Sequence, residues 1–117
     1  MMSVRAIQEV LKAELWCGED VLEREVHTAC GSDMMSDVLA YVKDQSVLLT
    51  GLINSQVIRT AEMMDMVCVV FVRGKEPDEN MIALAQEREL VLMSTSYRMF
   101  TACGLLYEGG LKGGCVL

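Results

Sequence analysis

No stretch of this chain is apolar enough, over enough residues, to cross a membrane. Hydrophobic residues make up 52% of the 117 residues, but no uncharged apolar run approaches the roughly 18 to 20 residues that a membrane-spanning helix requires. The first residues, MMSVRAIQEVLKAEL, are interrupted by charges and have helical spacing, so they lack the apolar core and cleavage site of a signal peptide. We therefore expect a globular, cytoplasmic protein that does not bind membranes.

Basic residues are also scarce. The chain has 10 Lys and Arg against 17 Asp and Glu, which gives a net charge of −7. This charge opposes long-range attraction to polyanions, and no basic stripe offsets it. The composition therefore argues against nucleic acid and anionic membrane as partners.

The residues that build metal and catalytic sites are few and scattered. One His cannot complete a zinc site, and the five cysteines are an odd number without CxxC spacing, so we expect reduced thiols, no metal and no cofactor: the cysteines are Cys17, Cys30, Cys68, Cys103 and Cys115. His27 lies three residues before Cys30, but this spacing does not guarantee contact and no oxyanion-hole signal accompanies it. The segment RGKEPDE lacks the first glycine and the hydroxyl residue of a phosphate-binding P-loop.

What the chain does have is a regular alternation of helical and strand patterns. Apolar spacing predicts five helices, over residues 4–15, 35–42, 57–64, 81–85 and 99–107. Strands are predicted at 21–26, 47–50, 66–72 and 90–93, of which the third, MVCVVFV, is almost wholly apolar and so should be covered on both faces. The order predicts an α/β fold, a mostly parallel sheet of about four strands with helices packed on its faces.

The alternation of charged and apolar residues in VLEREV places residues 21–26 at or near the margin of the sheet. At 117 residues the chain is one domain. The closing segment EGGLKGGCVL is glycine-rich and without periodicity, so we expect the domain to cover residues 1–112 and a flexible tail to cover 113–117.

Small or charged residues follow the strands at four junctions. In a parallel sheet such junctions share the carboxyl edge, where α/β sheets bind ligands. The junctions predict a ligand site made of Gly31, Ser32, Asp33, Thr50, Gly51, Arg73, Lys75, Ser94 and Thr95. Backbone donors, hydroxyls and two cations suit a small anionic ligand, such as a phosphorylated metabolite or an adenine nucleotide.

Structural roles compete with ligand binding at these positions. Asp33 precedes an apolar helical stripe and suits a helix N-cap. Thr50 and Thr95 can satisfy backbone groups at the strand ends. Arg73 and Lys75 bracket Gly74 after the most buried strand, but cations in loops are often only solvated.

Several of these segments together resemble a known family. GSDMMSDVLA, LLTG, QVIRTAEMMD, RGKEPDE and LMSTSYRMFTACGLLYEGGL resemble the small stand-alone DRTGG-domain proteins, over about residues 20 to 112. The domain is similar to the regulatory modules of phosphate acetyltransferases and of CBS-pair inorganic pyrophosphatases, and to the N-terminal domain of phosphocarrier-protein serine kinases. The Asp-Arg-Thr-Gly-Gly run itself is absent, and Thr50-Gly51 is the fragment of it that this chain contains. The resemblance implies an α/β regulatory domain that often self-associates and has no settled catalytic role.

Three functions fit these observations. We favour a non-catalytic regulatory or sensing module that binds a small anion at the strand ends and forms a homodimer. A structural adaptor that docks a partner protein, such as an enzyme, through a methionine-rich surface is the first alternative, since ten methionines, some in adjacent pairs such as Met34-Met35, cannot all face one core. A phosphotransferase-related enzyme is the second. Stabilisation by a ligand would distinguish the sensing module from the adaptor, and turnover of a substrate would distinguish the enzyme from both.

Overall fold

A five-stranded sheet forms the centre of the molecule. The structure, a computed structural model, describes residues 1–41 and 45–113. The strand order is β2-β7-β6-β5-β4. β4 (Thr28–Gly31), β5 (Ser46–Thr50), β6 (Cys68–Phe71) and β7 (Val91–Ser94) are parallel, whereas β2 (Glu14–Cys17) runs antiparallel to β7. The predicted α/β fold with a mostly parallel sheet is confirmed.

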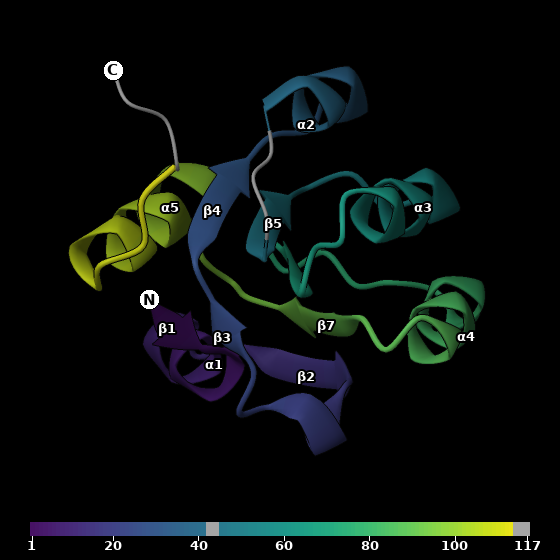
Figure 1. Cartoon of the computed structure of the whole chain (residues 1–117), viewed down its shortest axis with the longest axis horizontal. Helices are drawn as coiled ribbons and strands as arrows, with labels where there is room; N and C mark the ends of the chain where they lie inside the picture. The colour runs from purple at the N-terminus through teal and green to yellow at the C-terminus, as the bar shows by residue number, and fades with distance from the viewer. Residues whose placement is uncertain (42–44, 114–117) are drawn as a thin grey trace.

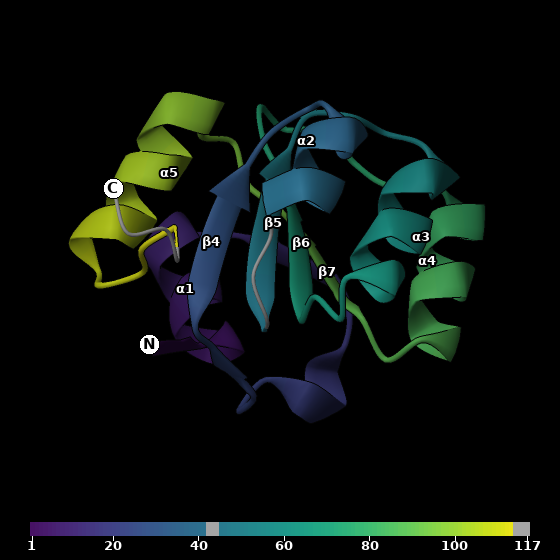
Figure 2. The ribbon, with the colours of Figure 1, turned by 45° about the horizontal axis from the view of Figure 1, so that its top comes forward.

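Helices cover both faces of this sheet (Figures 1 and 2). α1 (Val4–Leu11) and α5 (Met99–Glu108) pack on one face, and α2 (Met35–Tyr41), α3 (Ser55–Met63) and α4 (Glu79–Glu87) pack on the other. Side chains cap three of these helices: Ser3 accepts a hydrogen bond from the backbone N–H of Ala6, Asn54 accepts one from that of Gln56, and Asp78 accepts one from that of Met81.

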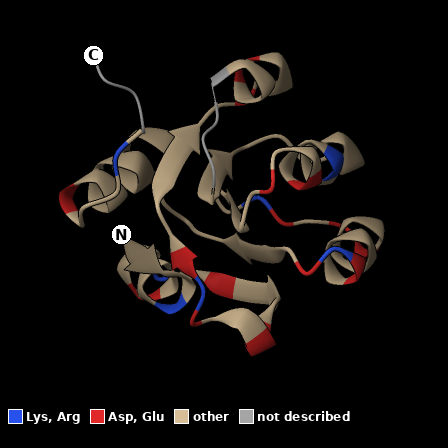
Figure 3. Cartoon of the chain, in the orientation of Figure 1, with Lys and Arg blue, Asp and Glu red and all other residues tan. Residues whose placement is uncertain are grey.

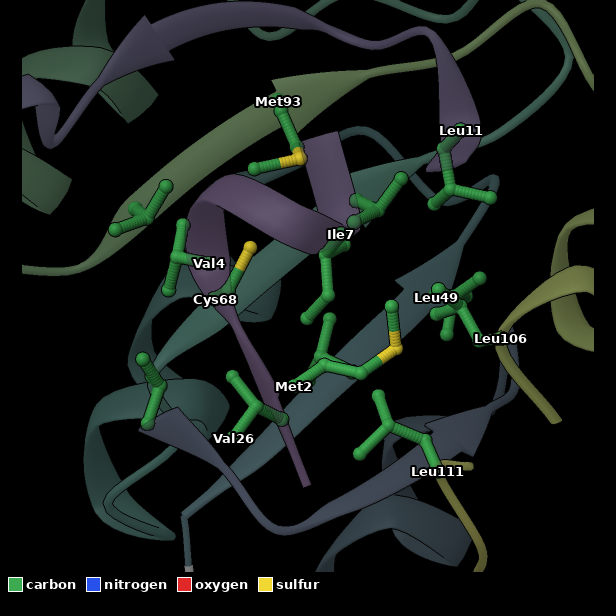
Figure 4. Packing of buried hydrophobic residues seen from close by; sticks show 14 of the residues in the cluster. Met2, Val4, Ile7, Leu11, Val26, Leu49, Cys68, Met93, Leu106 and Leu111 are labelled. Atoms are coloured by element: carbon green, nitrogen blue, oxygen red, sulfur yellow. The ribbon is translucent and has the colours of Figure 1, made fainter. Parts of the chain in front are cut away.

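The buried core lies on both sides of the central strand β6. Cys68 and Val70 pack toward α1 and α5, whereas Val69 and Phe71 pack toward the other three helices, and all four are fully buried. This burial on both faces is what the continuous apolar run predicted. Figure 4 shows the part of the core between the sheet and the helices α1 and α5. Side chains from α1 there meet those of the strands and of the C-terminal part of the chain.

The first helix is shorter than its apolar spacing predicts. It ends at Leu11, and Lys12 adopts a left-handed conformation (φ 50°) from which its N–H contacts the carbonyl groups of Gln8 and Glu9. Residues 14–17, expected to continue the helix, form β2 instead. Leu15 continues the helical spacing by coincidence, because its partner is Met93 of β7.

The prediction of a strand over residues 21–26 at the margin of the main sheet is wrong. The segment begins at the end of a 3₁₀ helix, η1 (Glu19–Val21), and forms strand only at β3 (Glu25–Val26), which pairs with β1 (Met2–Ser3) in a separate two-stranded sheet. Backbone hydrogen bonds from Val4 and Arg5 to the carbonyl groups of Arg24 and Leu22 hold this segment against the start of α1. The margins of the main sheet are β2 and β4 instead.

Part of the glycine-rich end of the chain is also packed. Leu111 is buried in the core, and the carbonyl of Lys112 accepts a hydrogen bond from Ala29 of the edge strand β4. Of the predicted tail at 113–117, residues 114–117 lie outside the described residues. Within the described part of the chain, no helix is both long and apolar enough to cross a membrane.

Charge is excluded from the parallel part of the sheet. Strands β4 to β7 contain no Lys, Arg, Asp or Glu, and within residues 1–41 and 45–113 the charged residues lie on helices, loops and the remaining strands (Figure 3).

Candidate functional site

The four predicted junctions lie at one edge of the sheet because the strands before them are parallel and aligned. Gly31 pairs with Leu49, and Thr50 pairs with Phe71, which pairs in turn with Ser94. The chain therefore leaves β4, β5, β6 and β7 at the same carboxyl edge, the upper edge in Figure 2.

Asp33, Thr50 and Gly51 form one group at this edge. The Oδ1 atom of Asp33 accepts hydrogen bonds from the backbone N–H of Gly51 at 2.7 Å and from the hydroxyl of Thr50 at 3.1 Å. Thr50 is fully buried, and its oxygen accepts a further bond from the N–H of Leu52 at 3.1 Å. The carboxylate thus joins the loop after β4 to the end of β5.

Arg73 extends this group from the next strand. Its guanidinium lies against Gly51, where a Cβ atom would collide with it. The backbone of Arg73 is in the left-handed region (φ 61°), and its N–H donates to the carbonyl of Tyr97 at 2.8 Å. Among the described residues, Arg73 forms no salt bridge. The guanidinium of the exposed residue Arg73, the N–H of Gly51 and the hydroxyl of Thr50 therefore lie at the ends of β5 and β6.

Ser94 and Thr95 are engaged in structural hydrogen bonds. The Ser94 hydroxyl donates to the carbonyl of Lys75 at 2.7 Å and accepts from the indole N–H of Trp16 at 2.8 Å. The Thr95 hydroxyl donates to the carbonyl of Leu11 at 2.7 Å. These bonds agree with the alternative that hydroxyls at the strand ends satisfy backbone groups and do not bind a ligand. They connect β2, β7 and the end of α1.

Gly31 and Ser32 serve local geometry. A Cβ on Gly31 would lie 2.7 Å from the Sγ atom of Cys103, so glycine lets α5 approach the edge strand closely. The Ser32 hydroxyl accepts a bond from the N–H of Met34 at 3.0 Å, which shapes the turn into α2.

A hollow of about 180 Å³ is lined by Ser94, Thr95 and Gly74. It is also lined by Lys12, Glu14 and Glu76, which the junction pattern did not indicate. Lys12 and Glu14 reach this edge only because the chain turns at Lys12 into an antiparallel strand, and the sequence carried no signal of that turn. The two carboxylates make this hollow less suited to an anion than the group around Arg73.

The thiols lack the features of activated nucleophiles. Burial raises the pKa of Cys17, Cys30, Cys68 and Cys103, so each stays protonated at neutral pH. None of these four is in a disulfide. Over residues 1–41 and 45–113 no three His, Cys, Asp or Glu side chains gather in a way that could hold a metal ion.

The fold and this edge define the chain as an α/β domain whose candidate ligand site lies at the ends of parallel strands. Comparison with protein families then identifies it: the DRTGG domain matches residues 6–108, so the chain belongs to the DRTGG domain family. The expectation drawn from its sequence motifs is confirmed. No curated protein sequence matches the chain.

A solved structure shares the fold. It comprises the CBS and DRTGG domains of the regulatory region of Clostridium perfringens pyrophosphatase, in complex with the activator diadenosine tetraphosphate. The two chains superpose with a TM-score of 0.71 at 18% sequence identity, and the match covers 89% of this chain and 45% of the other. This chain therefore spans less than half of that regulatory region. In the pyrophosphatase the DRTGG domain belongs to a regulatory region, and at this level of identity the likeness shows the fold.

Proposed function

We propose that this chain is a non-catalytic regulatory or sensing module that binds a small anionic ligand at the carboxyl edge of its sheet. The observation that carries the proposal is the position of the Arg73 guanidinium, exposed and without a salt bridge in the described structure, against the backbone of Gly51. Thr50 and Gly51, with Asp33 hydrogen-bonded to both, belong to the proposed site, and Lys75, two residues after Arg73, is proposed to supply a second cation. The other predicted site residues, Gly31, Ser32, Ser94 and Thr95, support it from the same edge.

The chemistry of this group favours a phosphorylated ligand. A guanidinium offers paired N–H donors that match the geometry of phosphate oxygens. Arg73 and Lys75 supply two cations within three residues of a chain whose net charge is −7. Because the related pyrophosphatase region binds diadenosine tetraphosphate, nucleotides are the first ligands to test.

Thermal unfolding tests the proposal directly. The panel is AMP, ADP, ATP, diadenosine tetraphosphate and common sugar phosphates, each at millimolar concentration. A ligand at a hundredfold excess over its dissociation constant stabilises the fold by about 2.7 kcal/mol, which raises the melting temperature by about 10 °C for a domain of this size. The proposal fails if none of these anions shifts the wild type.

Paired variants locate the binding site. Replacing both Arg73 and Lys75 with alanine is expected to abolish the shift while the unliganded protein stays folded, because both side chains are exposed. Replacing Arg5 and Arg59 with alanine removes the same charge from α1 and α3 and is expected to leave the shift intact. An equal loss in both double variants would indicate a general charge effect and contradict the proposed site.

We also propose that the module is a cytoplasmic homodimer, with residues 1–112 as its single domain and 113–117 as a tail. The exposed apolar side chains support self-association: Met34, Leu39 and Tyr107 are 60%, 44% and 61% exposed, and Phe100 is 89% exposed. They lie on or next to α2 and α5, the helices on either side of the edge strand β4 (Figure 1).

Exposed methionines, beside α2 and on α3, favour a second candidate function, docking of a partner protein. In the pair Met34-Met35 the first side chain is exposed and the second is buried, and in Met63-Met64 the first is 68% exposed. Cross-linking followed by mass spectrometry separates the two candidates, since self-association links this chain only to itself. Assays for turnover of the nucleotide panel test the enzymatic alternative.

A further inference from the structure

The donors that an anion would use at this edge already have an anionic partner. The Gly51 N–H and the Thr50 hydroxyl both donate to one oxygen of Asp33, at 2.7 and 3.1 Å. Hydrogen bonds to an ionised carboxylate are stronger than those to neutral acceptors. The carboxylate of Asp33 thus occupies the position in which a phosphate oxygen would receive these bonds.

A ligand anion and this carboxylate cannot share the position. An anion bound by the Arg73 guanidinium beside Gly51 comes close to the Asp33 oxygen, and like charges at such distances repel strongly. We infer that Asp33 is an internal competitor that holds the site closed, and that an anionic ligand binds by displacing its carboxylate from Gly51 and Thr50. This inference rests on the proposed function and adds a regulatory step to it.

The position of Asp33 permits this displacement. The residue is exposed, so its carboxylate can turn into solvent and recover hydration there. It lies in the short loop between the end of β4 at Gly31 and the start of α2 at Met35. Releasing it also releases the contact between the start of α2 and the end of β5, so ligand binding would be linked to the position of α2 and of the exposed Met34 beside it.

Calorimetric titration with pyrophosphate tests the competition, because this probe is a small polyphosphate without a base. The Asp33→Asn variant keeps an oxygen acceptor of the same shape but removes the charge, and Asp33→Ala removes both. We expect affinity for pyrophosphate to rise severalfold in Asp33→Asn and about tenfold or more in Asp33→Ala. The reason is that the ligand no longer has to break a charge-assisted hydrogen bond, and the free-energy cost of breaking one corresponds to a change in affinity of about that size. Asp37→Ala, which removes a carboxylate from the first turn of α2, is the control for net charge and should leave affinity near that of the wild type.

Each other result has a defined meaning. Equal gains in the Asn and Ala variants would show repulsion without displacement and overturn the inference. Unchanged or weaker binding in both, with the Asn variant melting as the wild type does, would overturn it as well. If pyrophosphate binds the wild type and Arg73→Ala weakens it, while the Asp33 variants bind no better, then the proposed site survives and the competition falls. If neither the wild type nor any variant binds pyrophosphate at millimolar concentration, the competition falls, and the thermal-shift panel of nucleotides and sugar phosphates decides the proposed site separately.

Discussion

At the scale of single residues, the backbone conformation of Arg73 lowers the stability of the fold while it places the guanidinium at the candidate site. A non-glycine residue in the left-handed region costs about 1 kcal/mol, and Arg73 has a φ of 61° next to Gly74 at 70°. We expect Arg73→Gly to stabilise the unliganded fold by about 0.5 kcal/mol, since the gain exceeds the added entropy of glycine in the unfolded chain, and to lose the anion response. Urea unfolding and the thermal-shift panel measure the two effects.

Glu89 supplies the matched control for that substitution. Its φ is 56°, and it lies before β7, at the opposite edge of the sheet from Arg73. Glu89→Gly should relieve strain of the same kind and keep the anion response. A ligand response that survives in Arg73→Gly would show that the guanidinium is not needed.

Asp33 shows what local sequence could and could not predict at this scale. A polar residue before an apolar stripe predicted a helix cap, and the same residue was predicted to belong to the site. Its observed partners, Thr50 and Gly51, are 17 and 18 residues away, a distance across which sequence spacing carries no information. For Thr95 the sequence suggested a structural hydrogen bond to the backbone, but it could not identify the acceptor, the carbonyl of Leu11, which lies 84 residues away.

At the scale of elements, the buried strands were predictable and the edge strands were not. β5, β6 and β7 are wholly buried, so their apolar runs stand out in the sequence. β2 and β4 lie at the margins with mixed burial. Residues 14–17 continue a helical spacing, and the TACG of β4 has no periodicity to detect, so only pairing with a neighbour makes either segment a strand.

The contact between α5 and β4 depends on a missing side chain at Gly31. A Cβ there would lie 2.7 Å from the Cys103 Sγ atom and 3.2 Å from the Met99 Sδ atom. Because α5 must shift to admit it, Gly31→Ala should destabilise the fold by about 1 to 2 kcal/mol in urea unfolding. Adding Cys103→Ala should restore part of that loss.

Gly104 on the same helix is the control for the Gly31 substitution. A Cβ at that position meets no atom within 4 Å. Gly104→Ala should therefore stabilise α5 by about 0.5 to 1 kcal/mol, since glycine is a poor helix former. If Gly31→Ala also stabilised the protein, the close approach of α5 to β4 would be wrong.

At the scale of the whole molecule, buried thiols link stability to alkaline pH. Burial raises the pKa of fully buried Cys68 well above its ordinary value of 9.0. The protonated thiol therefore favours the fold fully below pH 9, and this contribution is lost as pH rises from 9 toward the pKa of the folded state, at up to about 1.4 kcal/mol per pH unit for each such thiol. Cys68→Ala should lower stability at pH 7 by leaving a small cavity, but should flatten its decline between pH 9 and 10. Equal slopes in urea unfolding of the two proteins would contradict this.

The last prediction concerns assembly through the surface around β4. Phe100 is 89% exposed in the first turn of α5, a helix whose neighbouring residues Met99 and Cys103 pack against Gly31 of the edge strand. The edge strand β4 carries no charged residue, unlike the other edge strand β2, which carries Glu14, so two copies of an acidic chain can meet at β4 with less repulsion than at β2. We expect light scattering at high micromolar concentration to show a dimer, and Phe100→Asp to convert it to a monomer with unchanged melting of the isolated fold.

Met63→Asp is the matched control for the dimer, because Met63 is 68% exposed but lies on α3, away from β4. It adds the same charge and removes a comparable apolar surface, so it should leave the dimer intact. Dissociation by both variants alike would point to net charge and not to this surface. A wild type that stays monomeric at these concentrations would contradict the proposed dimer. The exposed side chains of Phe100 and Met34 would then favour binding of a different partner protein.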